Sequence, residues 1–447
     1  MLQTPDVTLP LARFVAASGW EEVPAEVRHQ AKRSFMNLFA VALAGCRAGP
    51  VEIALHSLCE FSGGKRATLI GRTERIDALS AAFLNAAAAN VHDFCDTHLR
   101  TVIHPTAPVA PALLALAELR KVTGPQLLLA FILGNEIQAR IGLAISPHHY
   151  DKGWHITSTC GVFGAAVGAG KLLGLDERQL VSALGMASTQ SSGLCECLGL
   201  PAKSVSVGNA ARNGLWSALL AEKGFAGPAE PLAGRQGFYH AMGDEPDLAL
   251  VTGGLGDSFE IMATSYKPYP CGFVIHPVLD CVLDWRRDHP DAEVARIVVR
   301  GNPLLAHRTD RPEISTGRES QVSVQHAVAA ALVHGKAGID QFADACVNDP
   351  RVVVLRRKVE VVRDRSFSTI AAAVDITTAD GAMHRLSQTA ARGSDVNPMS
   401  DHELEQKLRT AAASWNPKHD VGPLIDAVWS LDSSADVSGL ASLAVAA

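Results

Sequence analysis

The spacing of apolar residues predicts that most of the chain, from its start to about Lys267, is helical. Between Pro24 and Cys46, apolar residues recur at intervals of three and four, which is the period of one buried helix face. Pro24 suits the first turn of this helix, and Gly45 marks its end. Further segments of the same kind span residues 77–94, 110–119, 124–144, 158–174, 177–190 and 208–224. Their many small residues predict closely packed helices, and the lack of a fixed repeat period favours a bundle over a solenoid.

The pattern changes after Lys267, where strands alternate with helices. Segments that alternate or concentrate β-branched residues, as strands do, are 295–302, 351–364 and 368–381. Segments with the helical period are 276–288, 323–335, 400–415 and 421–431. The strands are thus confined to one stretch of the chain, with helices on both sides of it.

We therefore predict a mainly α fold built from two domains. A large all-helical domain is discontinuous and comprises residues 1–266 and 393–447, and a smaller α+β domain of residues 267–392 is inserted in it. The chain crosses twice between the domains, so we expect a cleft there, where ligand sites often lie.

Composition excludes several classes of partner. The 447 residues are 47% hydrophobic and carry a net charge of −6, so the chain can bury a large core. Lys and Arg are scattered, which argues against a nucleic-acid or membrane partner. The start of the chain lacks the features of a signal peptide, and we expect a cytoplasmic location. The nine cysteines are irregularly spaced, which predicts reduced and mostly buried thiols.

Candidate chemistry is concentrated in polar segments within apolar surroundings. The first groups His92, Asp93, Asp96, His98 and His104 just before a proline. Zinc binding by His92, Asp96 and His98 is one alternative, but their spacing is irregular and no compact partner motif completes a set of ligands. No nucleotide-binding glycine loop, G-x-S-x-G motif or H-E-x-x-H pair occurs in the chain. We therefore expect no metal and no common cofactor.

Each candidate residue also has an ordinary structural interpretation. His104 and His155 could cap the helices that follow them, although a helix N-terminus is also a natural carboxylate site. Asp93 could either orient a histidine or end the preceding helix. Lys203 and Lys267 could be surface lysines, yet both stand among Gly, Pro and Ser rather than on a charged helix face.

Five ordered motifs resemble the MmgE/PrpD family. They are Asp93 with Asp96-Thr97 and His104-Pro105, the G-W-H-x-T-S-T run at His155, Lys203 leading into "GNAARNG", the K-P-Y-P run at Lys267, and "NPMS" at Asn397. The family includes 2-methylcitrate dehydratase, cis-aconitate decarboxylase and iminodisuccinate epimerase. The resemblance implies a helical domain with an α+β lid, a homodimer, and an active site between the domains without metal or organic cofactor.

The resemblance also suggests roles for individual residues. The expected catalytic residues are Asp93, His104, His155 and Lys203, and the expected substrate-binding residues are Thr97, Lys267, His276 and His326. Two positions depart from the family pattern: decarboxylase-type members have a histidine at the position of Gly272 and a tyrosine at that of His326.

The predicted chemistry is abstraction of a proton from a carbon next to a carboxylate. Fixed cations stabilise the negative charge that develops there, and histidine suits the proton transfer because its pKa lies near neutral pH. The two departures favour an epimerase of iminodisuccinate or a similar amino-dicarboxylate. The alternatives are a lyase like 2-methylcitrate dehydratase or cis-aconitate decarboxylase, and a non-catalytic paralogue that binds a polycarboxylate.

Overall fold

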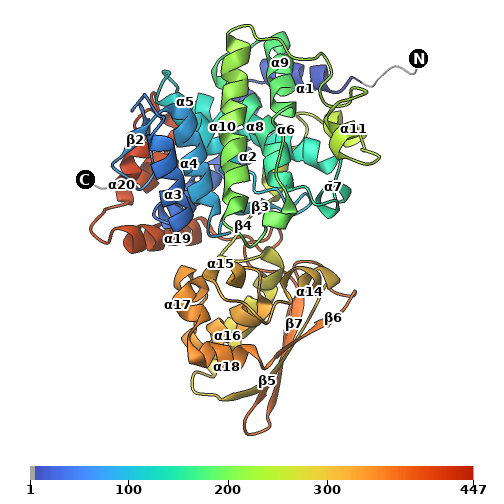
Figure 1. Cartoon of the computed structure of the whole chain (residues 1–447), viewed down its shortest axis with the longest axis vertical. Coiled ribbons are helices and arrows are strands. Elements are labelled where there is room, and N and C mark those ends of the chain that lie inside the picture. The colour runs from blue at the N-terminus through green and yellow to red at the C-terminus, as the bar shows by residue number, and fades with distance from the viewer. Residues whose placement is uncertain (1–5, 446–447) are drawn as a thin grey trace.

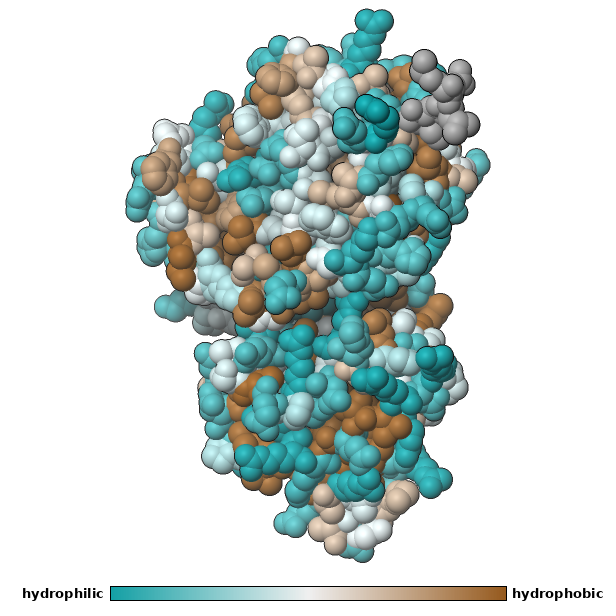
Figure 2. All heavy atoms as spheres, turned by 45° about the vertical axis from the view of Figure 1, so that its right-hand side comes forward, coloured by the Kyte–Doolittle hydropathy of each residue, from teal (hydrophilic) through white to brown (hydrophobic). Residues whose placement is uncertain are grey.

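The computed structural model describes residues 6–445, which form two parts joined at a constriction (Figure 1). The larger part is helical and has a core built from residues 7–266 and 399–444, and the smaller part has a separate core within residues 269–376. Figure 2 shows the same constriction in a space-filling view, bordered by both polar and apolar residues. The mainly α fold with a smaller inserted α+β part is thus confirmed, whereas the boundary residues stay predictions.

The larger part is a bundle of close-packed helices. Their bounds are α1 Thr8–Ala17, α2 Ala25–Gly45, α3 Gly49–Cys59, α4 Ala78–Asn90, α5 Thr106–Ala117, α6 Gly124–Leu143, α7 His148–Asp151, α8 Ile156–Leu172, α9 Glu177–Ser188, α10 Ala202–Glu222, α11 Phe238–Met242, α12 Ala249–Thr252, α19 Asp401–Trp415 and α20 Gly422–Trp429. Small residues allow the close approach: a Cβ atom added to Gly134 of α6 or Gly164 of α8 would lie 2.7 Å from the main-chain oxygen of the other. The prediction of closely packed helices is confirmed.

The larger part also contains two short sheets, so it is not all-helical as predicted. Strand β1 (Ala67–Thr68) pairs with β2 (Arg75–Ile76), and β3 (Asp96–His98) pairs with β4 (Thr264–Tyr266), both antiparallel. Strands of two or three residues are too short to show a period in the sequence. The second sheet brings the polar segment that begins at His92 next to Lys267, although they are far apart in the chain.

The smaller part contains a four-stranded sheet in the order β6-β5-β7-β8. Its strands are β5 Val294–Gly301, β6 Val359–Arg363, β7 Ala372–Thr378 and β8 Met383–Gln388, and its helices are α13 His276–Asp288, α14 Pro303–Thr309, α15 Gly317–Ser320, α16 Val324–His334, α17 Asp344–Val347 and α18 Pro350–Arg356. Strand β6 is parallel to β5, and the other neighbouring pairs are antiparallel. Helix α13 packs against β7 and β8.

One predicted strand is half wrong. Residues 351–364 were expected to form a strand, but α18 occupies the first half and only β6 is extended. The side chain of Asp349 accepts a hydrogen bond from the main-chain N–H of Arg351 at 2.9 Å, and Pro350 stands in the first turn. This helix start outweighs the strand preference of the three valines that follow.

Two further observations concern the cysteines and the apolar helices. All nine cysteines are free, and six of them are buried. Within residues 6–445, no single helix is long and apolar enough to cross a membrane; α2 and α3 reach that length and composition only as a pair bent by 85°. Most of α2 is buried in the core of the larger part.

Candidate active site

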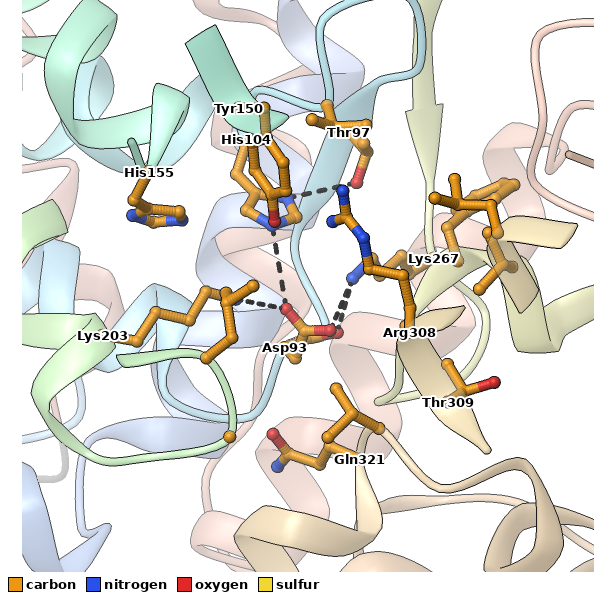
Figure 3. A pocket seen from close by; sticks show the side chains of 18 of the residues that line it. Asp93, Thr97, His104, Tyr150, His155, Lys203, Lys267, Arg308, Thr309 and Gln321 are labelled. Atoms are coloured by element: carbon orange, nitrogen blue, oxygen red, sulfur yellow. Dashed lines mark hydrogen bonds and ion pairs between the residues drawn. The ribbon is translucent and has the colours of Figure 1, made fainter. Parts of the chain in front are cut away.

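A cavity of about 150 Å³ lies between the two parts and is lined by both of them (Figure 3). The polar residues that line it are Asp93, Thr97, His104, Tyr150, His155, Lys203 and Lys267 on the side of the larger part, and Arg308, Thr309, Arg311, Arg318 and Gln321 on the side of the smaller part. Six of the eight residues predicted for the site therefore meet in one place. Their roles stay predictions.

Asp93 is the centre of this cluster. Lys203 Nζ donates a hydrogen bond to its Oδ1 at 2.6 Å, and Lys267 Nζ donates to its Oδ2 at 2.9 Å and to its main-chain oxygen at 3.1 Å. Burial by itself would raise the pKa of Asp93, but the two lysines and His104 outweigh it and hold the pKa well below its ordinary value. Asp93 is therefore an anion that holds two buried cations.

Local structure explains how these side chains meet. Asp93 follows α4 with a φ of 51°, a left-handed conformation that turns the chain out of the helix. Lys203 lies in the first turn of α10, and Lys267 directly follows β4. In the register of the small sheet Asp96 pairs with Tyr266, which sets Lys267 beside Asp93.

His104 is placed to act as a neutral base. Its Nδ1 lies 2.8 Å from the main-chain oxygen of Asp96 and 3.1 Å from Thr97 Oγ1. A carbonyl oxygen only accepts, so we assign the proton to Nδ1 and the lone pair to Nε2, which lies 3.7 Å from Asp93 Oδ1. Burial, with help from Lys203 and Lys267, holds the pKa of His104 well below its ordinary value. The ring is neutral at pH 7.

His155 stands at the start of α8 but does not cap it with its side chain. Its Nδ1 lies 3.2 Å from Ser206 Oγ and 3.3 Å from Ser158 Oγ. Burial, with Lys203 as the next cause, lowers the pKa of His155 to about 3. In Figure 3 both histidines lie on the same side of the Asp93 carboxylate. The cavity is thus lined by two imidazoles with lowered pKa values.

The charge balance of the cavity favours an anionic ligand. Five cationic side chains line it, namely Lys203, Lys267, Arg308, Arg311 and Arg318, against the single carboxylate of Asp93. Two of these cations are already paired with that carboxylate. The positive charge that is left over therefore lies mainly with the arginines of the smaller part. A ligand with several carboxylates would balance it.

Sequence models of two MmgE/PrpD domains match the chain. The MmgE/PrpD N-terminal domain matches residues 10–251, and the MmgE/PrpD C-terminal domain matches residues 269–432. The chain belongs to the MmgE/PrpD family. This confirms the resemblance drawn from the ordered motifs. The first matched range corresponds to the first stretch of the larger part, and the second covers the smaller part and most of the C-terminal return, including α19 and α20.

Relatives of the chain are enzymes. The cis-aconitate decarboxylase-like protein oryM of Aspergillus oryzae is 28% identical, over 98% of this chain and 97% of its own length. The cis-aconitate decarboxylase of Homo sapiens is 29% identical, over 93% and 90%. The mitochondrial 2-methylcitrate dehydratase of Yarrowia lipolytica is 26% identical, over 56% and 51%. The chain is accordingly an enzyme of the MmgE/PrpD family, and these relatives do not support the epimerase interpretation.

Two predicted site residues lie outside the cavity. His276 stacks on Phe273 with ring centres 4.6 Å apart, and its Nε2 lies 3.3 Å from the main-chain oxygen of Cys271. His326 Nε2 lies 2.7 Å from the main-chain oxygen of Gln341. Both rings are buried inside the smaller part, where they hold main-chain oxygens. We therefore no longer propose that His276 or His326 contacts the substrate.

The residues considered for zinc are bonded to other groups. His98 Nδ1 lies 2.8 Å from Thr101 Oγ1, and its Nε2 lies 3.0 Å from Glu260. Asp96 accepts a hydrogen bond from Thr106, and His92 Nε2 lies 3.2 Å from the main-chain oxygen of Ala44. In the part of the chain that the structure describes, no group of three or more His, Cys, Asp and Glu side chains is arranged to hold a metal ion.

Of the two departures from the MmgE/PrpD pattern, only Gly272 reaches the cavity. A Cβ atom added there would lie 3.8 Å from the main-chain oxygen of Gln321 and 3.9 Å from Thr309, which are ordinary contacts. The cavity wall therefore has room for a Cβ atom at the position where the family resemblance expects a histidine in decarboxylase-type members. The departure at His326 lies in the core of the smaller part.

The arginines of the smaller part and Tyr150 were not predicted from the sequence. Arg308 lies over the ring of Tyr150, with its guanidinium carbon 4.3 Å from the ring centre, and so connects the two walls of the cavity. Arg318 donates hydrogen bonds to the main-chain oxygen of Val91 and, at 2.6 Å, to Gln321 Oε1. The only signal in the sequence is the density of arginine between residues 308 and 318.

Proposed function

We propose that this enzyme is a lyase that removes a carboxylate group or water from a small polycarboxylate, with a tricarboxylate such as cis-aconitate as the first candidate. The observation that carries the proposal is the cluster in which two lysines share the Asp93 carboxylate beside the neutral imidazole of His104. Relatives named as cis-aconitate decarboxylases match the chain over nearly its whole length, and this supports the same class of substrate.

The cavity has cationic side chains on opposite walls, so it can bind two carboxylates of the same substrate. We place one carboxylate against Lys203 and Lys267 and a second against Arg308 on the opposite wall, since an arginine fork matches a carboxylate in geometry. Within a partly closed cavity such contacts are stronger than in water. They hold the reacting carbon near His104.

Both lyase reactions generate negative charge next to a carboxylate, which fixed cations stabilise. In decarboxylation the bond to the carboxylate carbon breaks, CO₂ leaves, and the electron pair stays on the substrate until a proton is added. In dehydration a base takes a proton from carbon while hydroxide leaves with a proton. His104 Nε2 is the base in the second case. Lys203, whose pKa burial lowers, is the acid in either case and recovers its proton from solvent. In dehydration His104 then releases to solvent the proton that it took from carbon.

Dehydration is the second candidate because of Gly272. The glycine contributes no side chain to the cavity where the family resemblance expects a histidine in decarboxylases. A relative named as 2-methylcitrate dehydratase supports this candidate over about half of the chain.

The test is the identity of the product. The purified protein is incubated separately with cis-aconitate, 2-methylcitrate and one stereoisomer of iminodisuccinate, and the products are followed by ¹³C nuclear magnetic resonance. We expect release of CO₂ from the first or loss of water from the second. His104→Asn should abolish the reaction, whereas the exposed control His402→Asn should not.

Three outcomes would contradict the proposal. Inversion of iminodisuccinate without an unsaturated product would restore the epimerase interpretation. Tight binding of all three compounds without turnover would favour a non-catalytic paralogue. Full activity in His104→Asn would remove the proposed base.

The homodimer remains a proposal from the family resemblance, and the cytoplasmic location remains a proposal from the sequence. Light scattering on the purified protein should give twice the mass of one chain. A mass equal to one chain across the working concentration range would reject the dimer.

A further inference from the structure

Lys407 is a buried cation just behind the catalytic cluster. It lies on α19, in the stretch that returns to the larger part after the inserted domain. Its Nζ donates hydrogen bonds to Asn37 Oδ1 at 2.7 Å, to the main-chain oxygen of Phe94 at 2.8 Å and to that of Lys267 at 2.8 Å. The same nitrogen lies 3.7 Å from the centre of the Phe94 ring. Lys407 does not line the cavity.

The two main-chain oxygens belong to the segments that carry the cluster. Phe94 directly follows Asp93, and Lys267 is the lysine that bonds to the Asp93 carboxylate. One ammonium group therefore ties together two stretches that are more than 170 residues apart in the chain. An ammonium has three N–H donors for its three acceptors, whereas a neutral amine has only two.

We propose that Lys407 is a positioning residue whose ammonium group fixes the main chain on both sides of the Asp93–Lys267 ion pair. The proposal rests on the proposed function, because positioning is measured through turnover. Lys407 acts through the main chain and does not touch the substrate. A loose ion pair would leave the neighbouring His104 and the bound carboxylate out of alignment.

Protonation of Lys407 provides a signature that a merely structural lysine would not give. Burial lowers its pKa to about 7; Cys95 and Asp96 oppose this shift, and Lys267 adds to it. His276 also faces this region, but burial lowers its pKa to about 3, so it stays neutral. As pH rises through about 7, the third donor is lost. The kcat/KM, which reports on the free enzyme, should fall over the same range.

The experiment compares Lys407→Met with a matched control, Lys171→Met. Lys171 Nζ also donates to three main-chain oxygens, at 2.8, 3.1 and 2.8 Å, but these belong to Val15, Ala16 and Ser18, and Lys171 does not line the cavity. We expect Lys407→Met to lower kcat by about 100-fold, the effect of a displacement of about 1 Å in an active site. Lys171→Met should change kcat by no more than about two-fold.

A second variant, Lys407→Arg, tests the proposal through the pH profile. Arginine stays protonated at every pH of the assay, so the fall in kcat/KM near pH 7 should disappear in this variant. Circular dichroism and thermal unfolding confirm that each variant is folded.

Three results would overturn the proposal. They are a kcat for Lys407→Met within about three-fold of the unmodified enzyme, an equal loss in Lys171→Met, or a fall near pH 7 that persists in Lys407→Arg. Failure of the proposed function is distinguishable, because the unmodified enzyme would then turn over none of the polycarboxylates.

Discussion

Replacing Asp93 by asparagine removes one charge while keeping the shape of the side chain. Asp93 neutralises two buried ammonium groups, at 2.6 Å from Lys203 and 2.9 Å from Lys267. Removing one member of a buried ion pair leaves an uncompensated charge and costs about 3–5 kcal/mol of folding free energy. Because two cations lose their partner together, we expect a loss near the upper end, about 5 kcal/mol.

Urea unfolding at pH 6 measures this loss, with Asp432→Asn as the control. Asp432 lies 3.0 Å from Lys32 in a pair whose carboxylate is well exposed, so its removal should cost no more than about 1 kcal/mol. The pH dependence adds a second check. Since the native pKa of Asp93 lies below its ordinary value, its contribution is fully present above about pH 4 and is lost as pH falls through the native pKa.

The reasoning would be refuted if Asp93→Asn lost no more stability than Asp432→Asn. It would also be refuted if the difference between the unmodified protein and Asp93→Asn stayed the same well below pH 4. Either result would mean that the cluster around Asp93 is solvated rather than buried.

Three further predictions concern the charges of the molecule. Lys203→Ala or Lys267→Ala should weaken the binding of a polycarboxylate by about 1.5–3 kcal/mol in titration calorimetry, and unchanged affinity in both variants would remove these lysines from the site. Arg308→Met should raise KM for a tricarboxylate by about tenfold or more and should raise KM for its monoester by less. The control Arg351→Met, at an exposed arginine that does not line the cavity, should change neither KM. Unfolding free energy should fall as pH drops below about 6.5, by about 1.4 kcal/mol per pH unit for each of the six histidines with lowered pKa values, because unfolding lets each take up a proton. These histidines are His92, His104, His149, His155, His276 and His326. The raised pKa of Asp96, about 6, offsets one of them between about pH 6 and 4, and a flat profile would contradict the lowered histidine pKa values.

The periodicity of apolar residues predicted those helices and strands whose structure depends mainly on their own residues. The helix predicted at residues 276–288 coincides with α13, because its apolar face repeats along one element. The short pairing of β3 with β4 could not be predicted, because each strand has three residues and its partner lies more than 160 positions away. Pairing over such distances depends on the packed bundle, which no local pattern encodes.

The candidate site was predictable where several polar and titratable residues stand close together in the sequence. Asp93 and His104 stand in one polar segment, and that segment lines the cavity. Arg308 and Lys407 were missed because only the fold brings them to the cluster, one across the cleft and the other from the C-terminal return. The reaction could not be predicted from the sequence either, because the same base and cations can serve decarboxylation, dehydration and epimerisation.

A crystal structure of the protein with propane-1,2,3-tricarboxylate, a saturated and unreactive analogue of aconitate, tests the central claim most directly. The account predicts the analogue in the cavity between the two parts, with one carboxylate on Lys203 and Lys267, another on Arg308, and a carbon within about 3.5 Å of His104 Nε2. Binding elsewhere, or binding in the cavity with His104 turned away from every carbon of the analogue, would contradict it.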